Sequence, residues 1–228
     1  MQPYLFPYVG YFQLMASVDK FILFDDVNFI NRGWINRNRI LVGGKDYLFT
    51  VPLQGTSQNK LINDIQISDE SNWKAKLLKT IEQAYKKAPC FNDAYPIISQ
   101  IINYENLNLA EYIYHSIVTV NKYLGIGCEL VPSSSIYNNR RLKGQDRILD
   151  ICRTELATEY MNLPGGQELY SQDKFFDYGV KLTFIKPLNF MYKQFDSDFE
   201  PWLSIIDLMM FNTNDQLAGF FLTRELVN

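Results

Sequence analysis

Short apolar runs of strand type alternate along much of this chain with segments of helical periodicity, and this alternation limits the fold more than any other feature. Residues 21–24 are typical of a buried strand, Val180, Leu182 and Phe184 alternate as in a strand, and residues 71–124 have helical spacing. Alternating strands and helices favour an α/β fold. We therefore predict a mixed or mostly parallel sheet with helical cover and a helical insertion around residues 71–124. At 228 residues the chain is expected to form one domain, residues 1–228.

Shorter elements follow from local signals. Residues 34–41 and 46–53 are predicted strands, joined by a tight turn at Gly43-Gly44. A further strand is expected at residues 62–67. Two helices, over residues 200–211 and 215–226, are expected to close the chain.

Composition and charge exclude several classes of protein. The net charge of −3 and the pI near 5.3 give no overall basic surface for nucleic acid. Three cysteines without CxxC spacing argue against a disulfide framework and a zinc knuckle, so we expect reduced thiols and no metal site. The single histidine, His115, excludes sites that need two histidine ligands. No apolar run reaches the roughly 20 residues of a membrane span, and no secretion signal is present, so a cytoplasmic protein is expected.

The first candidate site is the N-terminal run QPYLFPYVGYF. Its two prolines forbid regular strand pairing and predict a shaped loop that leads into a short helix. Backbone N–H groups at such a place can face a ligand, and Gly10 would permit close approach. Gln2, Tyr8, Gly10 and Tyr11 are therefore candidate substrate-binding residues. A rigid aromatic plug that closes the sheet is the alternative.

The second candidate is Asp25-Asp26, which directly follows a buried apolar run. Carboxylates at the carboxyl end of a sheet strand are well placed to hold a metal, a ribose or an amine. Neighbouring strand residues point to opposite faces, so only one of the pair needs to face the site. Asp25 and Asp26 are the candidate catalytic residues. A solvated strand end with an Asx turn is the alternative.

The third candidate lies in the predicted strand 34–39. There Trp34, Asn36 and Asn38 would share one face, while Arg37 and Arg39 would share the other. An aromatic platform beside two amides suits a sugar or a base, and arginines suit phosphate or carboxylate. All five are candidate substrate-binding residues, with a solvated basic edge strand as the alternative.

Two weaker signals lie further along the chain. A basic patch follows the serine run 133–135 and is as compatible with phosphates as with a solvated face; it comprises Arg140, Arg141, Lys143 and Arg147. Tyr192 and Gln194, with Ser204 and Asp207 nearby, are polar groups in an aromatic-rich C-terminal segment. Tyr192 and Gln194 complete the predicted substrate-binding set.

Taken together, these segments closely resemble a known family. The runs QPYLFPYVGYFQL, DKFILFDDV, RGWINRNRI and TVPL are similar to the opening of the WbqC-like family. The resemblance continues through VNKYLGI, SSS, DRILDIC, EYMNLPGG, YKQF and LSIIDLMMFN, and so covers nearly the whole chain. Two departures are visible: Met1 directly precedes Gln2, where relatives have a few apolar residues, and Asn189-Phe190-Met191 stands where a histidine is expected.

The resemblance implies a role in bacterial O-antigen and other surface-polysaccharide synthesis. It implies glycine transfer, which forms an amide with the amine of a nucleotide-linked amino sugar. Asp25 or Asp26 would then orient or deprotonate the amine, Arg37 and Arg39 would hold phosphates, and Trp34 with Asn36 and Asn38 would seat the sugar. Glycine or another amino acid would come from an ATP-activated acid, a thioester or an aminoacyl-tRNA. A glycosyltransferase-like enzyme and a non-catalytic sugar-nucleotide-binding protein of the same pathway are the alternatives.

Overall fold

Strands in this protein form several short sheets instead of one continuous sheet. The computed structural model describes residues 1–187, 190–196, 198–222 and 225–227. Its strand pairs are β1 (Lys20–Ile22) with β6 (Glu129–Val131), β2 (Arg37–Val42) with β3 (Lys45–Thr50), β4 (Leu53–Gln54) with β5 (Gln66–Ile67), and β7 (Glu159–Asn162) with β8 (Lys181–Lys186) and β9 (Glu225–Val227). The β1–β6 and β7–β8 pairs are parallel and the others antiparallel. The predicted α/β fold with mixed pairing is confirmed.

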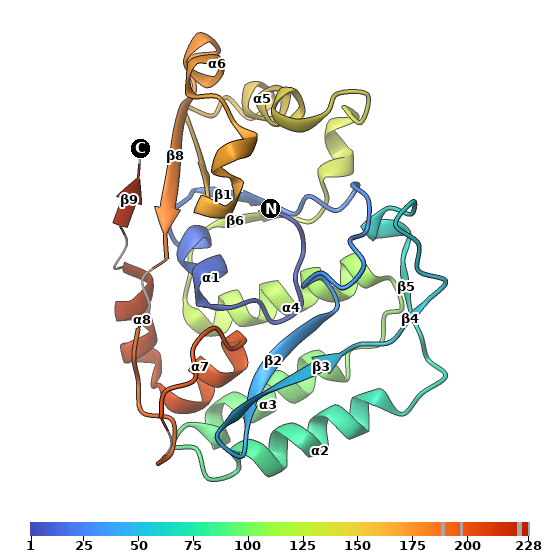
Figure 1. Ribbon diagram of the computed structural model, residues 1–228, viewed down its shortest axis with the longest axis vertical. Helices are drawn as coiled ribbons and strands as arrows, with labels where there is room; N and C mark the ends of the chain where they lie inside the picture. The colour runs from blue at the N-terminus through green and yellow to red at the C-terminus, as the bar shows by residue number, and fades with distance from the viewer. Residues whose placement is uncertain (188–189, 197, 223–224, 228) are drawn as a thin grey trace.

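The middle of the chain is helical, as predicted. Three consecutive helices contact one another in the lower half of Figure 1: α2 (Trp73–Tyr85), α3 (Phe91–Ile102) and α4 (Leu109–Leu124). α4 begins at Asn108, whose side chain accepts the Glu111 N–H, and ends at Gly125 in the left-handed conformation that glycine tolerates best. Their apolar faces, together with α1 (Val9–Met15) and the β2–β3 hairpin, enclose the main hydrophobic core.

A second, smaller core lies in the upper part of Figure 1. It is formed by α5 (Gly144–Thr154), α6 (Gln172–Asp177), β7 and β8, with Phe175 fully buried at its centre. β7 contributes to both cores, because Met161 packs against the main core and Tyr160 against the smaller one.

The segment at residues 62–67 differs from its prediction. Residues 62–67 are not one strand: a 3-10 turn, η1 (Ile62–Asp64), precedes β5. The turn forms because Ile62 N–H and Asn63 N–H donate to the carbonyls of Val27 and Asp25, which lie far away in the sequence.

The C-terminal segment forms α7 (Ile205–Phe211), α8 (Asn214–Leu222) and then β9, where the second closing helix was predicted to continue to residue 226. Pairing with β8 overrides local helix propensity there, and residues 223 and 224 of that prediction lie outside the described residues. None of the helices in the described ranges combines the length and apolar character that a membrane crossing requires.

Candidate functional site

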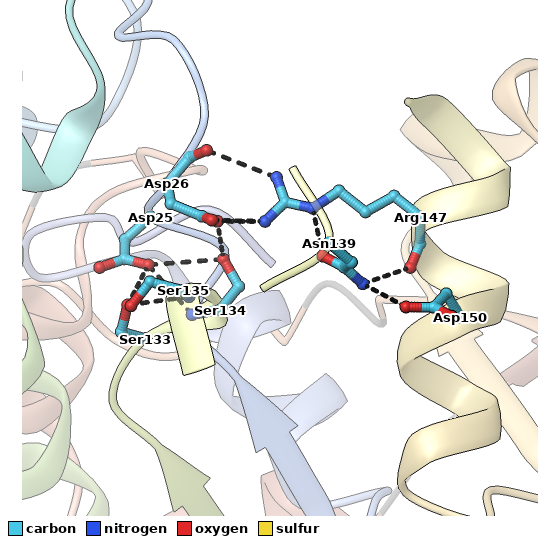
Figure 2. Close-up of polar contacts among 8 residues, drawn as sticks. All are labelled: Asp25, Asp26, Ser133, Ser134, Ser135, Asn139, Arg147 and Asp150. Atoms are coloured by element: carbon cyan, nitrogen blue, oxygen red, sulfur yellow. Dashed lines mark hydrogen bonds and ion pairs between the residues drawn. The ribbon is translucent and has the colours of Figure 1, made fainter. Parts of the chain in front are cut away.

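Asp25 and Asp26 lie where two neighbouring parallel strands end. The chain leaves β1 through Leu23-Phe24 to the aspartates, and it leaves β6 to the serine run that begins η2 (Ser134–Tyr137). Leu23 N–H donates to the Val131 carbonyl at 3.0 Å, and Ser134 N–H donates to the Leu23 carbonyl at 2.8 Å. Because parallel strands present their carboxyl ends at one edge, the aspartates and serines meet there (Figure 2).

The Asp25 carboxylate is buried and held at one oxygen only. Its Oδ1 accepts hydrogen bonds from Ser133 Oγ at 2.8 Å and from Ser134 N at 3.1 Å. The residue is 3% exposed, and burial raises the pKa of the Asp25 carboxyl above its usual value. Its second oxygen accepts no hydrogen bond from the described residues, and Figure 2 shows it pointing away from Arg147. Asp25 therefore has an oriented carboxylate in which one oxygen accepts no hydrogen bond from another described residue.

Asp26 is instead fixed in a buried ion pair. Arg147 Nη2 donates to its two carboxylate oxygens at 2.5 and 2.6 Å, and Ser134 Oγ donates to Oδ1. Arg147 Nε donates to Asn139 Oδ1 at 2.9 Å, and the guanidinium lies over the Phe24 ring. The ion pair neutralises Asp26 and fixes the position of Arg147. The two adjacent carboxylates thus have different environments.

A hollow of about 270 Å³ opens beside this ion pair, and we call it the Arg147 hollow. It is bordered by the loop that follows β1 and by the segment that leads into α5, including Arg140, Lys143 and Gly144. In the described ranges no group of three or more His, Cys, Asp or Glu side chains could hold a metal ion.

The N-terminal candidates are partly used by the fold. Tyr11 is fully buried, packs against Phe21 and donates its hydroxyl to the Gln2 carbonyl at 3.1 Å. A side chain at Gly10 would come within 2.5 Å of the Tyr8 ring, so glycine lets that ring lie over the start of α1. Gln2 and Tyr8 are half-buried and remain accessible to a ligand. Tyr11 therefore fits the alternative in which rigid, buried aromatic side chains close the sheet.

Trp34 lies on the arginine side of the hairpin, so its predicted shared face with the asparagines is wrong. The strand β2 begins only at Arg37, and Trp34 belongs to the turn before it. The guanidinium carbons of Arg37 and Arg39 lie 5.8 and 5.1 Å from the centre of the Trp34 ring. Each guanidinium is attracted to the indole ring by a cation–π interaction. With 41% of its surface exposed, Trp34 remains an open aromatic platform.

The two asparagines of this stretch anchor the backbone. Asn38 is buried, and its Nδ2 donates to the carbonyls of Leu5 and Phe6 at 3.2 and 2.7 Å. Asn36 Nδ2 donates to the Val51 carbonyl at 2.7 Å. Phe6 has a positive φ of 45°, which a non-glycine residue adopts only under strong constraint. Asn38 supplies such a constraint, since it ties the N-terminal loop to β2.

Tyr192 and Gln194 converge on a cluster around Asp207. Tyr192 Oη and Gln194 Nε2 each lie 2.7 Å from Asp207 Oδ2, and Tyr85 Oη lies 2.7 Å from Oδ1. Asp207 is completely buried, and this burial raises the pKa of its carboxyl. The polar groups satisfy one another across α2, α7 and the segment before α7, which indicates a structural network.

The predicted residues therefore form four groups: the N-terminal loop, the aspartates, the Trp34 platform and the Asp207 cluster. Tyr8 of the first group and Tyr192 of the last line the same small pocket. Sequence reasoning missed Asn139 and the pairing of Asp26 with Arg147. A signal for the pairing was present, because Arg147 precedes the buried Ile151 by one helical turn and so lies on the inner face of α5. An arginine at such a position requires a buried partner.

Comparison with known proteins identifies the family. A family model described as the WbqC-like protein family matches residues 2–218. The chain belongs to the WbqC-like protein family. The match extends across both aspartates, the serine run and Arg147, and it confirms the resemblance predicted from the sequence.

A relative in Mycobacterium tuberculosis (strain ATCC 25618 / H37Rv), described as the uncharacterized protein Rv1507c, is 29% identical over 218 residues. That alignment covers 94% of this chain and 92% of the relative. No solved structure matches the WbqC-like chain.

Proposed function

We propose that this protein is a cytoplasmic enzyme of bacterial surface-polysaccharide (O-antigen) biosynthesis. In this proposal it forms an amide by transferring an aminoacyl group, glycyl in the simplest case, to the amine of a nucleotide-linked amino sugar. Membership of the WbqC-like family supports the pathway. The reaction rests on one observation: Asp25 is a buried carboxylate with a raised pKa and one oxygen without a partner among the described residues.

The chemistry requires a base, because an amino sugar carries its amine mainly as an ammonium ion near neutral pH. Asp25 would first accept a proton from the ammonium, which frees the lone pair of the nitrogen. The neutral amine then forms its bond to the acyl carbon, and the bond from that carbon to the leaving group breaks. The leaving group is the phosphoryl oxygen of ATP-activated glycine, the thiolate of a thioester or the ribose oxygen of glycyl-tRNA, and the second nitrogen proton passes to it or to water. Burial makes the Asp25 carboxylate more basic, and hydrogen bonds from Ser133 and Ser134 keep it oriented.

Asp26 has a different role in this proposal. Its charge is already matched by Arg147, so we assign it to positioning Arg147 and the loop after β1. The glycosyltransferase-like alternative would use both carboxylates on one metal-bound nucleotide. The ion pair at Asp26 occupies both oxygens of that carboxylate, which favours the amide-forming proposal over that alternative.

The acyl donor in this proposal is glycine activated by ATP, and a glycyl thioester and glycyl-tRNA are the other donors to test. Trp34, flanked by Arg37 and Arg39, remains our candidate for contact with the sugar because its ring is exposed. The buried residues Tyr11 and Asn38 are assigned to the fold instead.

The test is incubation of the purified protein with nucleotide-linked amino sugars, glycine and ATP, followed by mass spectrometry of the sugar nucleotide. We expect a glycyl adduct with wild type, its loss in Asp25→Asn, and its retention in Asp69→Asn. Asp69 is exposed, so Asp69→Asn makes the same chemical change at the protein surface and serves as the control. Circular dichroism would verify that both variants fold.

Two results would count against the proposal. Absence of a glycyl adduct with all three donors would reject the reaction, and saturable sugar-nucleotide binding that Trp34→Ala abolishes would then favour the non-catalytic alternative. Full turnover by folded Asp25→Asn would reject Asp25 as the base.

A further inference from the structure

The Arg147 hollow carries more positive charge than the protein neutralises. Its lining includes Arg140, Lys143 and Arg147, while Asp26 is the only carboxylate among its lining residues. Asp26 is already paired with Arg147. No side-chain hydrogen bond or ion pair is formed by Arg140 or Lys143 within the described residues. Two cations therefore border a hollow without a counter-charge, in a chain whose overall charge is −3.

Nearby carboxylates do not compensate these cations. Asp146 pairs with Lys174, and Asp150 pairs with Arg153 and accepts a hydrogen bond from Asn139. The N-terminus of α5 adds positive potential at the same place. Lys143 precedes this helix, and its side chain accepts no hydrogen bond from the first helical N–H groups. Cations are unfavourable at this end of a helix unless an anion is present. The repulsion among these groups would be relieved by a bound anion.

The wall of the hollow is also preorganised. Arg147 is held by Asp26 at 2.5 and 2.6 Å, by Asn139 at 2.9 Å and by the Phe24 ring, 4.5 Å from the guanidinium carbon. Its Nη1 makes only a long contact of 3.4 Å with the Asp26 carbonyl, which leaves N–H capacity on the guanidinium. A fixed guanidinium binds an anion with little loss of conformational entropy.

We propose that the Arg147 hollow binds the diphosphate group of the nucleotide-linked sugar, with Arg140 and Lys143 as its exposed cations and Arg147 as its buried, fixed one. The volume of about 270 Å³ is slightly below the roughly 300–1,000 Å³ of pockets that enclose a whole ligand, which suits a diphosphate with the nucleoside and the sugar extending outward. Arginine and lysine are the side chains that bind phosphate oxygens most strongly. The identity of the ligand rests on the proposed function, whereas the anion site rests on the charges and the hollow. The assignment replaces Arg37 and Arg39, which contact Trp34, as the phosphate-binding residues.

The experiment is calorimetric titration of the full-length protein with inorganic pyrophosphate and with UDP. The variants are Arg140→Ala/Lys143→Ala and, as a matched control, Arg141→Ala, an exposed neighbouring cation that does not line the hollow. We expect each ligand to bind wild type and Arg141→Ala with the same affinity. UDP should bind more tightly than pyrophosphate, and the affinity of both ligands should fall as salt is added. The double variant should lose affinity by at least about tenfold, since charge-assisted hydrogen bonds are removed.

Equal affinity of the double variant and Arg141→Ala, or no binding of either ligand to wild type, would overturn the site. If UDP binds no more tightly than pyrophosphate, the assignment of the hollow to a nucleotide-linked ligand would be overturned. Thermal melting of each variant would confirm that it folds. The result is separable from the proposed function: amide formation without binding at this hollow rejects only the site. Binding here without amide formation from any donor supports the site and rejects the reaction.

Discussion

Replacement of Asp26 by asparagine should destabilise the protein strongly, because it leaves the Arg147 charge buried without its partner. The two side chains are 1% and 5% exposed, and the guanidinium makes two short contacts to the carboxylate. Breaking a buried pair by removing one partner costs about 3–5 kcal/mol. Water can reach Arg147 from the adjacent hollow, so we expect the lower end of that range.

A loss of about 3 kcal/mol in a chain of this length corresponds to a fall in melting temperature of roughly 6–12 °C. The assay is urea unfolding followed by circular dichroism, with thermal melting as a second measure. The matched control is the double variant Asp26→Asn/Arg147→Met, which removes both charges and should recover much of the loss. A loss below about 1 kcal/mol in Asp26→Asn, as for a surface ion pair, would refute the reasoning.

Three further predictions concern the fold. Asn38→Ala should lower the free energy of unfolding by about 2 kcal/mol, because two loop carbonyls lose their donor; a change below about 0.5 kcal/mol in urea unfolding would contradict its anchoring role. Asp207 has a pKa above the ordinary 3.8, so the native state retains this proton to higher pH than the unfolded state. Its contribution to stability should fall as pH rises above that value, and the stability of Asp207→Asn relative to wild type should therefore rise with pH; a constant difference would argue against the raised pKa. If the chain is a single domain, unfolding should show one transition by both tryptophan fluorescence and far-ultraviolet circular dichroism, since Met161 and Tyr160 of β7 join the two cores; non-coincident curves would show that the cores unfold separately.

The sequence predicted the position of the aspartates because the signal there is local. A buried apolar run that ends in Asp25-Asp26 marks the carboxyl end of a strand, and the serine run at 133–135 follows a second strand in the same way. The apolar run at residues 21–24 located the first of these strands, β1. It could not show that Asp26 meets Arg147, because the two are 121 residues apart in the chain.

The interpretation of residues 34–39 failed for a related reason. The alternation rule applies only inside a strand, and β2 starts at Arg37, so the rule could not place Trp34. The role of Asn38 depends on carbonyls 32 and 33 residues away, which no local pattern encodes. The asparagines had been attributed to a ligand, whereas Asn38 serves the backbone.

The central claim is that Asp25 accepts a proton from the amine of the sugar. Its most direct test is a crystal structure of the protein with a nucleotide-linked amino sugar, in which the distance from the amine nitrogen to the carboxylate of Asp25 is measured. We predict about 2.6–3.2 Å to the oxygen that does not contact Ser133. A well-ordered sugar whose amine lies beyond the reach of Asp25, even through one bridging water, would contradict the account.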